Sequence, residues 1–139
     1  MTSEIIVVLI VIVSLFIGMH CLYLYWLHKI LKVTAFPYPW ITWLTIIPFV
    51  GNILWAYLIY KAKLGAALLL KNNNSSKTTT CGFYTFMAFF SVNIVSFFLI
   101  SNEKAINICS IIVAILYFIQ FFQLYRAKKI LIAFGQNNS

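Results

Sequence analysis

Hydrophobic residues in this chain of 139 residues fall into four long runs without formal charge, at residues 5–27, 41–60, 82–101 and 106–125. A helix needs about 20 apolar residues to cross the ~30 Å hydrocarbon core of a bilayer. Each run has that length. The pattern therefore predicts four transmembrane helices.

Polar segments separate these runs and suggest how they pair. Residues 71–80 (KNNNSSKTTT) form a polar loop of low complexity in the middle of the chain, and residues 102–105 form a very short link. We therefore expect an all-α integral membrane protein, a single domain over residues 1–139 whose four spans form two hairpins. Residues 126–139 are expected to form an amphipathic C-terminal tail.

The second run holds the strongest helix breaker in the chain. Pro48 lacks a backbone N–H, and its ring clashes with the carbonyl one turn earlier, so the second helix is expected to be kinked there. Gly51 and Asn52 follow directly. Freed carbonyl groups in lipid need partners, so this turn should face protein. One helical stripe carries the polar atoms of the run, namely Thr42, Thr45, Pro48, Asn52, Trp55 and Ile59.

The pattern P-W-x-x-W-x-x-x-x-P at residues 39–48, with the aromatic residues after it, resembles stretches of short bacterial membrane proteins. This resemblance implies the bacterial inner membrane as the location. It implies no role for any single residue.

Composition supports a membrane protein and helps to orient it. The chain is 63% hydrophobic and 9% charged, whereas a soluble domain has about 25% charged residues. The net charge of +8 comes from loop cations, which orient helices and contact anionic lipid, so we expect no nucleic acid partner. With four complete spans, a cytoplasmic N-terminus places seven cations inside and three outside. Both termini are therefore expected to be cytoplasmic.

Small and polar side chains recur on one face of the first and of the last run. Such faces allow close helix contact or hydrogen bonds between helices. The residues concerned are Ser14, Gly18, Cys21 and Tyr25 in the first run, and Asn107, Ser110, Ala114, Tyr117 and Gln120 in the last. Asn52, Asn93 and Gln120 are expected either to bond between helices or to line a path for a solute.

Chemistry-bearing groups are scarce. Glu4 and Glu103 are the only two carboxylates, so paired-carboxylate catalysis is excluded within one chain. The sequence contains no GxxxxGK[ST], GxSxG or HExxH motif, and its three cysteines form no CxxC pair. His20 is a candidate haem or metal ligand, but a second chain would have to complete its site. We therefore expect no enzyme, no cofactor and no metal.

These observations predict a small non-enzymatic membrane protein, a subunit or assembly component of a membrane complex or homo-oligomer. Its partners would be the lipid bilayer and other membrane subunits or copies of itself. The alternative is a small channel or carrier for a neutral or anionic solute, with its site at the broken second helix. The residues expected at a substrate or packing site are Pro48, Gly51, Asn52, Asn93 and Gln120.

Overall fold

The computed structural model describes residues 2–47 and 50–136. In that part of the chain all regular elements are helices, which confirms the all-α class. The elements are α1 (Ser3–Val33), the 3-10 helix η1 (Pro39–Ile46), α2 (Val50–Asn72), α3 (Phe83–Phe98) and α4 (Glu103–Gln136). Of the helices described, α1, α2 and α4 are long and apolar enough to cross a membrane, and α3 is a shorter apolar helix.

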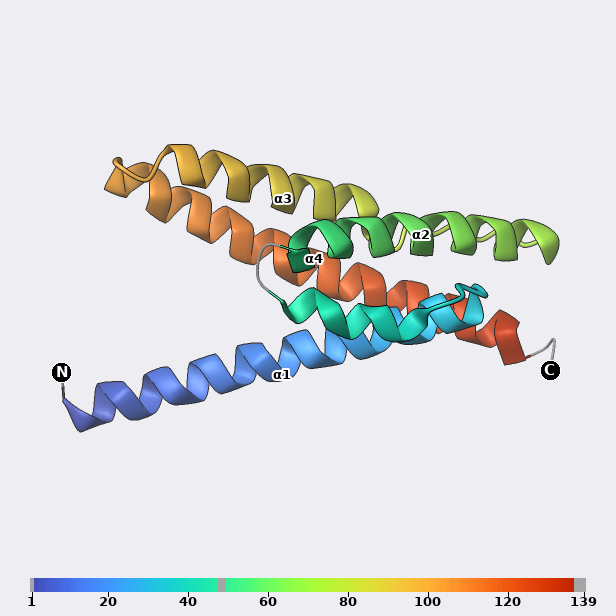
Figure 1. Ribbon diagram of the computed structural model, residues 1–139, viewed down its shortest axis with the longest axis horizontal. Coiled ribbons are helices and arrows are strands. Elements are labelled where there is room, and N and C mark those ends of the chain that lie inside the picture. Colours follow the sequence, from blue (N-terminus) through green and yellow to red (C-terminus); the bar gives the residue numbers. More distant parts are fainter. Residues whose placement is uncertain (1, 48–49, 137–139) are drawn as a thin grey trace.

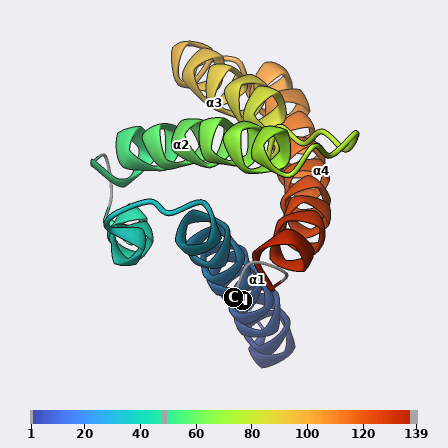
Figure 2. The same ribbon diagram turned by 90° about the vertical axis from the view of Figure 1, so that its right-hand side faces the viewer.

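The helices lie along one long axis (Figure 1). In that view α1, α2 and α4 run from left to right, whereas η1 and α3 run in the opposite direction. The beginning of α1 and the end of α4 therefore lie at opposite ends of the molecule. Seen along the axis, η1 lies beside α1, and α2 extends from η1 to the pair formed by α3 and α4 (Figure 2).

The hydrophobic core is built on the second half of α1. Buried side chains recur there every three to four residues, which places them on one helix face: Tyr23, Leu24, Leu27, Ile30 and Leu31. This face packs against α2 and α4. All side chains of residues 3–18 are exposed, so the first half of α1 extends away from the other helices.

The second apolar run does not form the single kinked helix that we expected over residues 41–60. It is divided between η1, which ends at Ile46, and α2, which begins at Val50. In η1 the hydroxyl of Thr42 donates to the carbonyl of Pro39, and the hydroxyl of Thr45 donates to that of Thr42, both at 2.7 Å. These bonds span three residues and favour a tight 3-10 turn. The expected kink at Pro48 lies outside the described residues.

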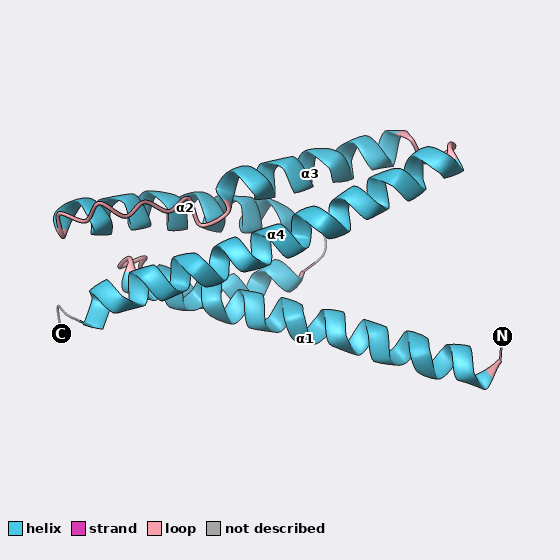
Figure 3. Cartoon of the chain, turned by 180° about the vertical axis from the view of Figure 1, so that it is seen from behind, coloured by secondary structure: helices cyan, strands magenta, loops and turns pink. Residues whose placement is uncertain are grey.

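The second helix also ends later than expected. α2 continues past Lys61 and Lys63 to Asn72, because apolar residues at four-residue spacing keep one face buried: Leu58, Ala62, Ala66 and Leu70. The polar loop that follows runs back along α2 to α3 (Figure 3), and its residues line small hollows together with α2 and with α4. Similarly, α4 extends beyond the expected end at residue 125 and includes most of the expected tail.

Lysine side chains lie over aromatic rings at one level of the molecule. The Lys128 ammonium of α4 lies 5.1 Å from the ring centre of Trp26 in α1. Likewise, the Lys63 ammonium of α2 lies 4.5 Å from the ring centre of Tyr84 in α3. Within single helices, the same contact is made by Lys29 over Tyr25 and by Lys61 over Tyr57.

Candidate functional site

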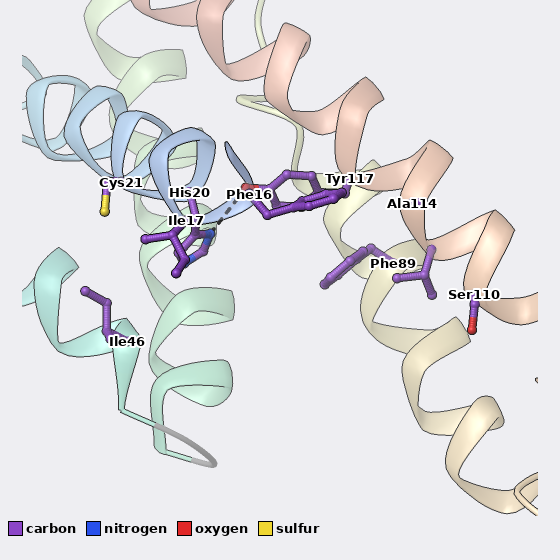
Figure 4. Close-up of a pocket in the computed structure, with 10 residues that line it drawn as sticks. Phe16, Ile17, His20, Cys21, Ile46, Phe89, Ser110, Ala114 and Tyr117 are labelled. Atoms are coloured by element: carbon purple, nitrogen blue, oxygen red, sulfur yellow. Dashed lines mark hydrogen bonds between the residues drawn. The ribbon is translucent and has the colours of Figure 1, made fainter. Parts of the chain in front are cut away.

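A cleft of about 530 Å³ opens where α1 diverges from α4. It is lined by side chains of four elements: Phe16, Ile17, His20 and Cys21 of α1, Ile46 of η1, Phe89 of α3, and Ser110, Val113, Ala114 and Tyr117 of α4 (Figure 4). The predicted small and polar face of α4 therefore lines this cleft at Ser110, Ala114 and Tyr117. On α1, a side chain added at Gly18 would meet no atom within 4 Å, so none of the described helices packs there.

His20 and Tyr117 join the two helices at one side of the cleft. The Nδ1 atom of His20 lies 3.3 Å from the Tyr117 hydroxyl, a hydrogen bond in which either group can be the donor (Figure 4). The His20 ring also meets the edge of Trp55, with ring centres 5.3 Å apart. The imidazole is therefore held between neighbouring helices.

A buried hydrogen-bond network adjoins this pair. The Tyr23 hydroxyl accepts hydrogen bonds from the Gln120 amide at 2.7 Å and from the Trp55 indole N–H at 3.3 Å. Tyr23 and Gln120 are completely buried. Within residues 2–47 and 50–136, the Gln120 Oε1 atom has no hydrogen-bond partner. The network thus links α1, α2 and α4 by hydrogen bonds between buried side chains.

The comparisons with known proteins add no relative. No family model, no curated protein and no solved structure matches this chain.

The predicted site residues are distributed over two places. Asn52 and Asn93 line a second hollow of about 530 Å³ together with Trp55 and Phe89, and the Asn93 amide donates to the carbonyl of Phe89 on its own helix. Gln120 is not part of that hollow, because it faces Tyr23 in the core. The three amides therefore do not surround one cavity.

Gly51 and Pro48 complete the predicted set. Gly51 lies so close to the Thr45 carbonyl that an added Cβ atom would collide with it, which brings α2 and η1 into direct backbone contact. Its N–H donates to the carbonyl of Ile47 at 2.7 Å. Pro48 lies outside the described residues.

Sequence reasoning missed the importance of Tyr23, which belongs to none of the small and polar faces predicted above. A signal was present in the spacing of Tyr23, Leu27 and Ile30, which marks a buried helix face. The spacing could not reveal Gln120 as the hydrogen-bond partner of Tyr23, because the two residues are 97 positions apart in the sequence.

The arrangement packs the helices together and joins them by hydrogen bonds. No group of three or more His, Cys, Asp or Glu side chains that could hold a metal occurs among the described residues. Cys81, just before α3, is buried, and burial raises the pKa of its thiol to about 12. The thiol therefore stays protonated at neutral pH and is a poor nucleophile.

Proposed function

We propose that the chain is an integral membrane protein in which α1, α3 and α4 cross the bilayer. Lysine-over-aromatic contacts support one boundary, because Trp, Tyr and Lys gather at membrane interfaces. From Trp26 back to Glu4, and from Tyr125 back to Glu103, α1 and α4 each rise about 33 Å, close to the ~30 Å of a hydrocarbon core. The two carboxylates then lie at the opposite boundary.

In this proposal η1 and α2 form a re-entrant hairpin instead of a fourth span. The eight residues of η1 rise about 16 Å, and α2 rises about 17 Å from Val50 to Lys61, so each reaches only about halfway across the bilayer. Irregular backbone at that depth must be enclosed by protein. The buried Thr42 and Thr45 side chains and the contact with Gly51 supply that enclosure.

The distribution of cations supports a cytoplasmic C-terminal end. Nine of the ten cations lie near or beyond the aromatic level on the side where α1, α2 and α4 end, and Lys104 lies at the other end. Under the positive-inside rule this is a stronger bias than the seven-to-three division of four complete spans. We therefore place the start of α1 outside, instead of both termini inside. The bacterial inner membrane remains the proposed location.

Within the membrane, we propose that the chain is a non-enzymatic subunit that binds a transmembrane helix of another chain in the cleft between α1 and α4. The observation that carries this proposal is the cleft itself, where two helices with small and polar faces diverge instead of packing. Small residues let helix backbones approach closely in lipid, and Ser and His can bond to the incoming helix. The exposed first half of α1 extends this surface.

Photo-cross-linking from inside the cleft tests the function. A photoreactive amino acid at Val113, which lines the cleft, should produce a cross-linked polypeptide in native membranes. The same residue at Ile115 is the matched control, because Ile115 is 53% exposed and lies on another face of α4. Reaction at Val113 only with lipid would contradict the proposal.

A substitution that fills the cleft gives an independent measurement. Ala114→Trp should reduce recovery of the cross-linked partner, or of a differently tagged second copy, by about tenfold or more. Ile115→Trp should change recovery by less than about twofold. A monomer without any associated chain in mild detergent, for the unmodified protein, would count against the subunit role.

The second candidate function is a carrier or channel for a neutral or anionic solute. The shared hollow of Asn52 and Asn93 beside the proposed re-entrant hairpin favours it, since interrupted helices expose polar backbone groups to substrates. Flux into liposomes should then occur and should fall in Asn52→Leu. Equal flux in both proteins, or no flux in the unmodified protein, would remove this candidate.

A further inference from the structure

A cationic groove lies between the polar loop after α2 and the last part of α4. Lys77 and Thr78 of the loop line it on one side, and Arg126 and Lys129 of α4 line it on the other, around a volume of about 660 Å³. A smaller hollow of about 250 Å³ adjoins it and shares Thr78 and Arg126. The two hollows thus form one continuous site built from two elements.

Among the described residues, no Asp or Glu side chain compensates the charge of this groove. Arg126 and Lys129 are three residues apart on α4, which makes them neighbours on the helix surface, and Lys77 contributes a third cation. The only two carboxylates among Asp and Glu, Glu4 and Glu103, begin α1 and α4 at the other end of the molecule. Like charges repel one another, so an anion that binds among these three cations relieves that repulsion.

Hydrogen-bond donors complete the site. The smaller hollow is lined by the hydroxyl-bearing residues Thr78, Thr79 and Thr80 and by the amide of Gln123. Because the Gln123 carbonyl accepts a 2.7 Å hydrogen bond from Thr85, its NH₂ group is left to face other partners. Hydroxyl and amide donors beside an arginine are the chemistry that recognises phosphate oxygens.

The position of the groove indicates where the phosphate comes from. Arg126 directly follows the uncharged run of α4, and Lys129 lies about 4.5 Å further along the helix axis. The headgroup layer on each side of a bilayer is about 5–8 Å thick. In the membrane orientation proposed above, both cations therefore lie at headgroup depth. Basic pockets between helices at this depth on the cytoplasmic side bind anionic lipid headgroups.

We propose that this groove binds the phosphate headgroup of an anionic phospholipid of the cytoplasmic leaflet. Lys77, Arg126 and Lys129 hold the phosphate charge, and the threonine hydroxyls with Gln123 bind its oxygens. Since the groove connects the loop to α4, a bound lipid would also fasten the loop against that helix.

Lipid binding to the full chain in a neutral detergent tests the proposal without relying on the membrane orientation. Native mass spectrometry would measure binding of phosphatidylglycerol and of phosphatidylcholine. We expect phosphatidylglycerol to bind at least about tenfold more tightly, and an equal concentration of inorganic phosphate not to displace it. Equal binding of the two lipids, or displacement by inorganic phosphate, would overturn the assignment of a lipid site.

Charge variants separate a built site from general attraction. Each cation near a lipid phosphate is worth about fivefold in binding, so Arg126→Gln with Lys129→Gln should weaken phosphatidylglycerol binding by about 25-fold. Lys128→Gln is the matched control, because Lys128 lies over Trp26 and Tyr125 and does not line the groove. It should weaken binding by less than about twofold, and an equal loss in both would overturn the proposal. Lys77→Gln, in the loop, should weaken phosphatidylglycerol binding by about fivefold. This variant replaces the double variant if the double variant does not fold.

Discussion

Gly51, in the first turn of α2, lies against the backbone carbonyl of Thr45 in η1 with no room for a side chain between them. This contact closes the pair formed by η1 and α2. It also explains why a glycine stands in the first turn of α2, where a larger residue would separate the two elements.

Gly51→Ala should therefore destabilise the protein by about 1–3 kcal/mol, the usual cost of forcing extra atoms into a packed interior. Thermal unfolding in mild detergent would measure this loss. Gly18→Ala is the control, since an added Cβ atom there meets nothing within 4 Å, and its midpoint should stay nearly unchanged. Equal midpoints for both variants would show that the Gly51 contact is not as close as described.

Removing the Tyr23 hydroxyl should also be costly. Tyr23→Phe leaves the Gln120 amide and the Trp55 indole N–H buried without their acceptor, and an unsatisfied buried donor costs about 1–3 kcal/mol. Unfolding in a denaturing detergent would measure the change in free energy.

Adding Gln120→Leu to Tyr23→Phe should recover part of that loss, because one of the unpaired polar groups is then removed. The double variant should be more stable than the sum of the two single changes predicts. Simple additivity would mean that Tyr23 and Gln120 do not interact in the folded protein.

Cys81 predicts a pH dependence of stability. In the unfolded chain its thiol ionises near its ordinary pKa of 9.0, whereas burial raises the folded pKa to about 12. Between these values the folded state holds more protons than the unfolded state, so the free energy of unfolding should fall as pH rises, by up to about 1.4 kcal/mol per pH unit. In Cys81→Ala the free energy of unfolding should decline less steeply between pH 9 and 11. If the unmodified protein and the variant decline equally steeply, Cys81 is not the source of the pH dependence.

The helical class and the lengths of the apolar runs could be predicted because they depend on local composition. An uncharged run of about 20 residues favours helical structure, and the regular elements described in the four runs are all helical. The division of the second run could not be predicted, because it depends on the threonine hydroxyls of η1 and on the approach of Gly51 to another element.

The sequence contains the apolar pattern that continues α2, but charged residues interrupt the uncharged run there. The uncharged run ends at Tyr60, directly before Lys61, although Ala62, Ala66 and Leu70 continue the buried face of α2. Lysine stems can lie along apolar surface with the charge turned toward water or an aromatic ring, so these charged residues do not end the helix.

The candidate site was predicted only in its parts. Helical spacing placed Ser110, Ala114 and Gln120 on one face of the last run, and the sequence left open whether Gln120 bonds between helices or lines a path for a solute. The sequence could not show that Ser110 and Ala114 face an open cleft, since the divergence of α1 from α4 results from packing at the other end of both helices.

The most direct test of the proposed architecture is to measure, in intact cells, on which side of the membrane each end of the described chain lies. Ser3→Cys and Ala133→Cys would each be introduced into a variant that lacks the three native cysteines, and treated with a membrane-impermeant maleimide. With three crossings and a re-entrant hairpin, the cysteine at position 3 reacts in intact cells, and the one at position 133 reacts only after the membrane is permeabilised. Reaction of both from the same side would contradict this architecture and restore four complete spans.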